Sequence, residues 1–384
     1  MADPGVSAGR RCRRPSRIFF RIAANAALVL AALAGMAPFA APALRAQPPR
    51  PGIPPPAVPS PLPPPPPPPA ATTTPKAFLM NGVRYIDARP FFSRCGLTGE
   101  RPVPGAGARF VFSNRWSRIE IEHDKRDVLI NGVKAYLGDA ALVRHGTLYV
   151  SGPDTEKLFV PILRPAGLKV TRPLRTIVID AGHGGKDTGT QNKALGYDEK
   201  KFTLVVARLL QAKLSGGPWR VLMTRNDDRF IDLGVRSEMA AKAGADLFIS
   251  IHFNAVAGSA AVKGTETFIL TPGNQRSTGA DQRTAADAKI HPGNAHDEWN
   301  AQLGYQIQRH LMARLGSVDR GLKRARFAVL REAPCPAVLI EAGYLSNTAE
   351  ARKIATDAYR QDIAESIAAA VRVYAAALDT AAGK

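Results

Sequence analysis

The stretch TIVIDAGHGGKDTGT, residues 176–190, leads from an apolar strand into a glycine-rich turn. The apolar run 177–179 is typical of a buried strand, Asp180 ends it, and His183 stands among the glycines that follow. Three interpretations compete: a phosphate cradle, a metal site, or a plain loop histidine. The glycine spacing matches neither GxGxxG nor GxxxxGK[ST], and a histidine in the middle serves no phosphate. The rest of the chain must decide between a metal ligand and a loop residue.

Strand-like and helix-like runs alternate from Arg172 onward. This alternation predicts an α/β domain with a mostly parallel, twisted sheet that helices cover on both faces. In such sheets, ligands bind beyond the carboxyl ends of the strands. The expected strands are residues 176–180, 219–224, 246–254, 265–270 and 336–343, and the expected helices are residues 198–214, 233–244, 300–315 and 364–378.

Three polar residues fall at the ends of expected core strands. His183 follows the first strand, His252 lies near the end of LFISIH, and Glu341 ends AVLIE. One such residue would be ordinary, because a lone histidine at a strand end is usually a packed or loop residue. Three at one edge of one sheet are hard to assign to packing, so this edge is the candidate site.

Glu199 adds a second carboxylate to this set. Phe202, Val206 and Leu209 form an apolar stripe in the helix after the first strand, and Glu199 lies on the same line near the helix start. A buried, ionised carboxylate needs a partner. A helix cap or a pair with one of the two lysines that follow would satisfy it. A metal shared with the two strand-end histidines explains more.

The donor types favour zinc. Two imidazoles and one carboxylate are a common catalytic zinc set with a fourth position left for water, and they suit zinc better than calcium or magnesium. Under this interpretation His183, Glu199 and His252 hold the metal, and Glu341 stands apart and transfers protons. Asn254, just past the second histidine, is a candidate for orienting the substrate.

Five blocks of the chain carry a family resemblance. In order, they are IVIDAGHGGKDTGT, DEKKFTLVVARLL, VLMTRNDDRFIDLGVRSEMA, ADLFISIHFNA and DRGLKRARFAVLREAPCPAVLIEAGYLSN. Together they resemble the zinc-dependent N-acetylmuramoyl-L-alanine amidases of the amidase_3 type, over residues 174–378. The resemblance implies the metal ligands His183, Glu199 and His252 and the catalytic residue Glu341. It also implies hydrolysis of the amide between N-acetylmuramic acid and L-alanine in peptidoglycan, with an envelope activator or scaffold protein as a candidate partner.

Two other functions stay open at this point. One is a zinc peptidase or deacylase that acts on a different amide. The other is a non-catalytic peptidoglycan-binding protein with the same fold, whose expected mark would be the loss of one of the four residues.

Residues 76–170 predict a small, mainly β accessory domain ahead of the catalytic domain, residues 171–384. The Asn-Gly pairs at 81–82 and 131–132, flanked by alternating apolar residues, indicate hairpins. The pattern INGVKAYL…HGTLYV…LFVPIL resembles the small β domain named after the N-terminal domain of copper amine oxidases, and it implies no copper. His123 and His145 are expected to be ordinary surface or packing residues. We expect this part to fold independently and to take no part in catalysis.

The first 75 residues point to export. An arginine cluster and an apolar run predict a signal peptide, residues 1–46, with cleavage near Ala43 or Ala46, and a retained membrane anchor is the alternative. Residues 47–75 form a proline-rich linker of polyproline II character. The net charge of +20 and the pI near 10.3 favour an anionic partner. Export argues against nucleic acid, so the expected location is the periplasm or cell envelope, with membrane contact only during export.

Two further features complete the expectations. Residues 271–298 are polar and rich in Gly and Pro, and we expect a mobile loop in which His291, His296 and Glu298 are solvated. In some members of the resembled family this region carries an inhibitory helix over the zinc. The cysteines of the mature chain, Cys95 and Cys335, lack metal-ligand or CxxC spacing, and Cys335, ahead of an apolar strand, is expected to be a buried free thiol.

Overall fold

The computed structural model describes residues 76–99 and 109–383. The predicted signal peptide, residues 1–46, and the predicted linker, residues 47–75, lie outside the described residues. Within the described ranges, no helix combines the length and the apolar character needed to cross a membrane.

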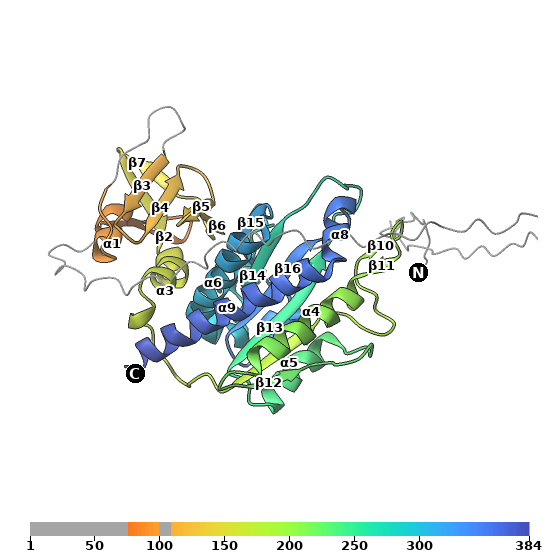
Figure 1. Ribbon diagram of the computed structural model, residues 1–384. Helices are drawn as coiled ribbons and strands as arrows, with labels where there is room; N and C mark the ends of the chain where they lie inside the picture. Colours follow the sequence, from red (N-terminus) through yellow and green to blue (C-terminus); the bar gives the residue numbers. More distant parts are fainter. Residues whose placement is uncertain (1–75, 100–108, 384) are drawn as a thin grey trace, which may run out of the picture. The chain divides into compact units, whose positions relative to one another are not determined.

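A ten-stranded sheet forms the centre of the described chain, in the order β12-β9-β13-β16-β14-β15-β6-β5-β4-β3 (Figure 1). Strands β12, β9, β13 and β16 are parallel, as are β14 and β15, whereas β14 runs antiparallel to β16. The α/β prediction is therefore confirmed. The strands of the C-terminal part are β9 (Thr176–Ala181), β12 (Arg220–Met223), β13 (Leu247–Asn254), β14 (Thr265–Leu270), β15 (Asp319–Ala325) and β16 (Ala337–Tyr344), and a small pair is formed by β10 (Gln191–Asn192) and β11 (Tyr197–Asp198).

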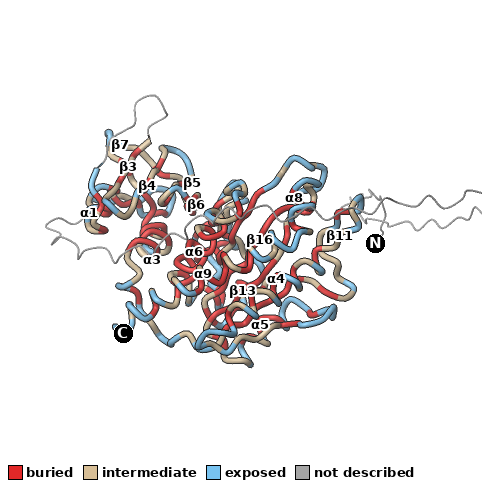
Figure 2. The backbone as a smooth tube through the Cα atoms, in the orientation of Figure 1, coloured by how far each residue is buried: buried red, intermediate tan, exposed pale blue. Residues whose placement is uncertain are grey.

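Helices cover both faces of this sheet. Successive residues of a strand point to opposite sides, so each central strand contributes to a core on either face. Ile177 and Ile179 of β9 belong to the larger core, which α4, α6 and α9 cover, whereas Val178 belongs to a smaller core under α5 and α7. Figure 2 shows that burial is concentrated in the central strands and the helices against them. The helices are α4 (Glu199–Leu214), α5 (Leu233–Lys242), α6 (Asp297–Leu315), α7 (Ala328–Arg331), α8 (Thr348–Ile354) and α9 (Asp357–Ala381).

Helix α4 buries a stripe that differs by one position from the expected one. Glu199, Thr203, Val206 and Leu210 are buried, at spacings of four, three and four residues. Phe202 and Leu209, which were expected on this line, are only half-buried, so that part of the prediction was wrong. The stripe still begins at Glu199.

The strands of residues 76–170 divide between two sheets. Strands β1, β2, β7 and β8 form a separate four-stranded sheet, whereas β3 to β6 extend the ten-stranded sheet through the pairing of β6 with β15. The elements are β1 (Ala77–Met80), β2 (Val83–Asp87), α1 (Ala88–Arg94), β3 (Arg109–Ser113), β4 (Arg118–Glu122), β5 (Asp127–Ile130), β6 (Val133–Tyr136), β7 (Leu142–Arg144), β8 (Thr147–Ser151), α2 (Gly152–Asp154), η1 (Thr155–Phe159), α3 (Val160–Leu163) and η2 (Pro165–Gly167).

Three hairpins join these strands through turns with two left-handed residues. The expected turns at 81–82 and 131–132 are confirmed, with φ of 50° and 73° in the first and 51° and 78° in the second. A third, at His145 and Gly146, has φ of 49° and 74° and joins β7 to β8. His145 is therefore a turn residue.

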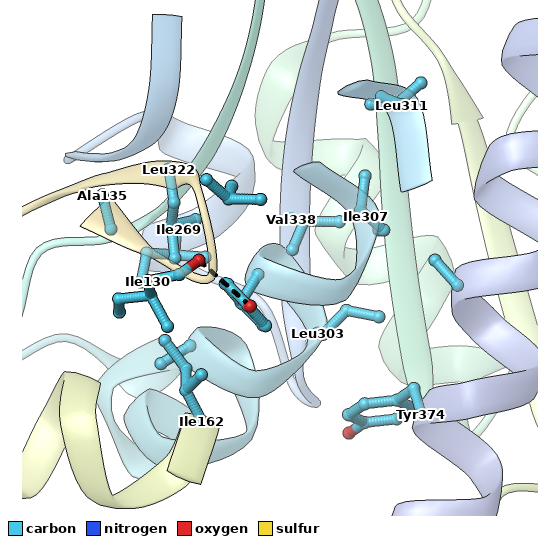
Figure 3. Packing of buried hydrophobic residues seen from close by; sticks show 14 of the residues in the cluster. Ile130, Ala135, Ile162, Ile269, Leu303, Ile307, Leu311, Leu322, Val338 and Tyr374 are labelled. Carbon is cyan, nitrogen blue, oxygen red and sulfur yellow. Dashed lines mark hydrogen bonds between the residues drawn. The ribbon is translucent and has the colours of Figure 1, made fainter. Parts of the chain in front are cut away.

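A shared apolar core joins the accessory strands to the C-terminal strands. Ile130 and Ala135 of the accessory part lie in one apolar cluster with Ile269 and Leu322 of β14 and β15, and Ala135 pairs with Leu322 in the strand register (Figure 3). The division of the chain at residue 171 stays a prediction, as does the resemblance of the accessory part to the copper amine oxidase domain.

The segment 271–298 is not the free loop that its composition suggested. It contains two short 3-10 helices, η3 (Ala285–Ala288) and η4 (Pro292–His296). Arg126 of the accessory part fixes it, because its guanidinium donates to the backbone carbonyls of four residues, Arg276, Ser277, Thr278 and Ala280.

The three residues of this segment that were expected to be solvated differ in exposure. His291 is only 7% exposed, so the expectation was wrong for it. His296 and Glu298 are partly exposed, and Glu298 pairs with Lys157 at 3.4 Å. None of the three belongs to the group of potential metal ligands found among the described residues.

Cys95 and Cys335 are buried free thiols, which confirms the expectation for Cys335. Burial raises the pKa of Cys95 to about 11 and that of Cys335 to about 12, so neither is a reactive thiolate near neutral pH.

Candidate metal centre

Three side chains meet beyond the carboxyl ends of β9 and β13. His183 Nε2 and His252 Nδ1 each lie 3.0 Å from Glu199 Oε1, and the two ring nitrogens are 3.2 Å apart. These are the three residues that the strand ends and the α4 stripe predicted. The structure brings them together into one group of potential metal ligands.

The size of this triangle fits a small tetrahedral ion. Ligand atoms about 2.0–2.1 Å from a tetrahedral zinc lie roughly 3.3 Å from one another. The observed separations of 3.0–3.2 Å are close to that value. Two imidazole nitrogens and a carboxylate also match the donor preferences of zinc.

Glycines make room for these ligands. A Cβ at Gly182 would lie 2.2 Å from His252 Cε1, so a side chain at this position would displace the imidazole. A Cβ at Gly189 would lie 2.6 Å from Glu199 Oε2 and 2.7 Å from His183 Cδ2. The glycines of this turn therefore leave room for the candidate ligand side chains, and their presence does not require a phosphate-binding function.

Glu199 is fixed as an anion at the start of α4. Its Oε1 accepts from the backbone N–H of Phe253 at 3.0 Å, and its Oε2 accepts from that of Thr190 at 2.8 Å. Burial acts to raise the pKa of Glu199, but His183 and His252 outweigh it and hold that pKa well below its usual range. The carboxylate is therefore charged and ready to accept a cation.

The ring of His183 is oriented by a carboxylate that the sequence did not single out. His183 Nδ1 lies 2.9 Å from Asp187 Oδ2, and Gly189 N–H donates to Asp187 Oδ1 at 3.0 Å. A carboxylate on one ring nitrogen directs the lone pair of the other toward the site, as is common for histidine ligands. The only signal in the sequence was the spacing of four residues within the same turn.

Glu341 lies beside the ligand group, one strand further across the sheet. In the strand register His252 pairs with Glu341, and Glu341 pairs with Glu266 of β14. Within the described part of the chain, Glu341 Oε2 is buried and has no hydrogen-bond partner. Burial, followed by the charges of Glu199 and Glu266, raises the pKa of Glu341 well above its ordinary value.

Glu266 is a further charged residue that sequence reasoning missed. It is 2% exposed and accepts from Tyr344 Oη at 2.8 Å, from Arg320 Nε at 3.3 Å and from Lys323 Nζ. Asn254 Nδ2 donates to the same carboxylate at 2.6 Å, while its Oδ1 accepts from the next backbone N–H at 2.7 Å. Both polar atoms of the Asn254 side chain are therefore engaged within the protein.

The fold and the donor set define a class: an α/β protein with a candidate metal centre at the carboxyl edge of its sheet. A sequence model of the Amidase_3 family, described as N-acetylmuramoyl-L-alanine amidase, matches residues 177–373. The chain belongs to this family.

The chain is similar to several individual proteins. The chain is 33% identical over 224 residues to the N-acetylmuramoyl-L-alanine amidase AmiC of Escherichia coli, which covers 53% of this chain and 53% of that protein. It is 37% identical over 190 residues to the amidase CwlM of Bacillus licheniformis, covering 49% of this chain and 64% of that protein. A solved N-acetylmuramoyl-L-alanine amidase from Clostridium difficile 630 is 32% identical, with a TM-score of 0.45, and the match covers 53% of this chain and 97% of that one. The chain thus spans about half the length of curated relatives such as AmiC.

Proposed function

We propose that this chain is a zinc-dependent N-acetylmuramoyl-L-alanine amidase that cleaves peptidoglycan between N-acetylmuramic acid and L-alanine. The observation that carries the proposal is the triangle of His183 Nε2, Glu199 Oε1 and His252 Nδ1, with sides of 3.0–3.2 Å, next to the carboxyl group of Glu341. Family membership and the printed names of the relatives point to the same reaction.

In this proposal His183, Glu199 and His252 hold the metal. A zinc ion held by them would supply Lewis-acid activation of water and of the amide carbonyl. Three protein ligands are the usual number at a catalytic zinc site.

Glu341 is the proposed proton carrier. Its buried Oε2 has no partner among the described residues, whereas Glu266 is bound by Lys323, Arg320 and two neutral donors. Glu341 therefore takes the proton from the attacking water and delivers it to the leaving α-amine of L-alanine. The substrate-orienting role of Asn254 remains a proposal, and a substrate group that bonds its amide must compete with Glu266.

The proposal extends to the setting of the enzyme. We infer export by residues 1–46 and a spacer formed by residues 47–75, which place the enzyme in the periplasm or cell envelope. The net charge of +20 suits a cell wall whose stem peptides carry carboxylates. An envelope activator or scaffold protein remains a candidate partner.

Digestion of purified peptidoglycan by the purified protein tests the function. We expect intact glycan strands and free stem peptides that begin with L-alanine, identified by mass spectrometry. A chelator should stop the release, and added zinc should restore it.

Each rival function has its own product pattern. Fragments cleaved elsewhere in the peptide would identify a zinc peptidase or deacylase. Binding to the wall without any release, at full zinc occupancy, would identify a non-catalytic wall-binding protein.

A further inference from the structure

A buried hydrogen-bonded chain leads away from the metal centre through the sheet. His252 Nε2, the ring nitrogen that faces away from Glu199, lies 3.1 Å from Ser250 Oγ. Ser250 Oγ in turn lies 2.7 Å from Asp180 Oδ2. Ser250 and Asp180 are fully buried and pair across β13 and β9 in the strand register.

The chemistry of these groups sets the direction of every hydrogen bond. An ionised carboxylate can only accept, so the single hydroxyl proton of Ser250 points to Asp180. Ser250 Oγ is then left with acceptor lone pairs only, so His252 must donate from Nε2. When His252 ligates a metal through Nδ1, its one ring proton lies on Nε2, the nitrogen that faces Ser250.

This argument needs Asp180 to stay ionised, and its surroundings ensure that. Arg236 Nη1 lies 2.7 Å from Asp180 Oδ1, and Thr224 Oγ1 donates to the same oxygen at 2.7 Å. Burial opposes ionisation, but Arg236 and the hydroxyls of Ser250 and Thr224 outweigh it and lower the pKa of Asp180.

Arg236 also holds the other histidine. Its Nη2 donates to the backbone carbonyl of His183 at 2.9 Å, and its Nη1 donates to that of Ala181 at 2.9 Å. His183 has a left-handed backbone with φ of 62°, which a non-glycine residue adopts only when its surroundings impose it. One buried guanidinium therefore supports both the turn of His183 and the hydrogen-bonded chain to His252.

We propose that Asp180, Ser250 and Arg236 form a positioning relay that orients the ring of His252 so that its Nδ1 faces the candidate metal position. Asp187 does the same for His183 directly, whereas His252 is served through a hydroxyl. The inference rests on the proposed metal centre, and it assigns these buried residues a role in metal affinity that packing alone would not give them.

Ser250→Ala removes the acceptor of His252 and leaves Asp180 paired with Arg236. Thr224→Val is the matched control, because it also removes a buried hydroxyl from Asp180 but lies outside the path to His252. Ser250→Thr keeps the hydroxyl and serves as the rescue variant. Zinc affinity is measured on the full chain by competition with a chromogenic chelator.

We expect Ser250→Ala to bind zinc about 10–100-fold more weakly, the usual cost of losing an outer-shell partner. Thr224→Val should bind zinc as the parent does, and Ser250→Thr should recover most of the affinity.

Two results would overturn the relay. One is unchanged zinc affinity in Ser250→Ala, and the other is an equal loss in Ser250→Ala and Thr224→Val, which would show a general effect on the core. A parent that binds no zinc would instead contradict the metal centre itself.

Discussion

Two regions of this molecule bury charged side chains, and they use them differently. The first, which we call the metal edge, is the candidate metal centre with Glu341. Among the described residues, the Glu199 carboxylate contacts two imidazoles and two backbone N–H donors, and Glu341 Oε2 has no hydrogen-bond partner. The second, which we call the seam, is the contact between the accessory strands and β15 around Asp154 and Arg324. There both oxygens of Asp154 accept hydrogen bonds. Its donors are Gly138 N, Ser151 Oγ, Gln275 Nε2 and Arg324 Nη1, at 2.6–3.1 Å.

The difference distinguishes a candidate active site from a contact that stabilises the fold. Donors surround both oxygens of Asp154, and the buried guanidinium of Arg324 balances its charge, so this carboxylate costs little to keep and needs no ligand. A carboxyl group left with an open oxygen costs stability, and it is retained where chemistry uses it. The metal edge should therefore respond to mutation in activity, and the seam should respond in stability.

The largest expected effect separates the two glutamates of the metal edge. Glu341→Gln should bind zinc nearly as well as the parent and react about 10²–10⁴-fold more slowly, the usual loss on removing a general base. Glu199→Gln should lose both zinc affinity and rate, because it removes a ligand. Zinc analysis and the rate of stem-peptide release check this, and excess zinc should restore part of the rate only in Glu199→Gln. The reverse pattern would exchange the two assigned roles.

The seam should show its largest effect in unfolding. Asp154→Ala leaves Arg324, which is 1% exposed, as an uncompensated buried charge, so we expect a loss of about 3–5 kcal/mol in the free energy of unfolding. Asp139→Ala breaks the partly exposed pair with Arg283 and should cost only about 0–1 kcal/mol. Urea unfolding of the zinc-loaded proteins measures both. Similar losses in the two variants would mean that the buried pair has no special weight.

Sequence reasoning singled out the residues of the candidate metal centre because they follow strong local patterns, and their role as ligands stays a prediction. His183, His252 and Glu341 each follow an apolar strand, and parallel strands bring their carboxyl ends to one edge. Glu266 escaped notice because β14 runs antiparallel to β16, which brings its first residues to that same edge. No local pattern reports the direction of a strand, so its side chain could not be placed from the sequence.

The contacts of the seam could not be predicted from the sequence for a different reason. Asp154 and Arg324 are separated by 170 residues, and neither lies on a periodic apolar stripe that would mark it as buried. The fit of Gln275 against Gly138, where a Cβ would lie 2.4 Å from Gln275 Nε2, is likewise a tertiary contact. For this reason the segment 271–298 read as a mobile loop, although its partners lie in the accessory part.

A smaller effect on the free energy of unfolding depends on pH and comes from Asp297, the first residue of α6. Burial raises the pKa of Asp297 from 3.8 to about 6, so the folded protein binds its proton more tightly than the unfolded chain does. The contribution of Asp297 to the free energy of unfolding is fully present below about pH 4. It falls as the pH rises to about 6, by up to about 3 kcal/mol. Asp297→Asn keeps the bond from Asn294 to Oδ1 and should remove that fall. Urea unfolding of both proteins at several pH values measures the difference, and parallel profiles would contradict the raised pKa.

The smallest effect tests whether the accessory strands and the catalytic part unfold together. Gly82 turns the hairpin between β1 and β2 with φ of 73°, and a Cβ there would meet nothing within 4 Å. Gly82→Ala should therefore cost only backbone strain, roughly 1–2 kcal/mol. Gly167→Ala is the control, because that glycine also has open space but no left-handed backbone, and it should be close to neutral.

The decisive measurement for this variant is hydrogen exchange of the β13 amides, far along the chain from the substitution. If the shared core and the Asp154–Arg324 pair join both parts into one cooperative unit, Gly82→Ala should weaken protection in β13 by the same 1–2 kcal/mol that it costs in β2. Protection lost in β2 alone would show that residues 76–170 open by themselves. The seam would then be a contact between two independent domains, as we expected from the sequence.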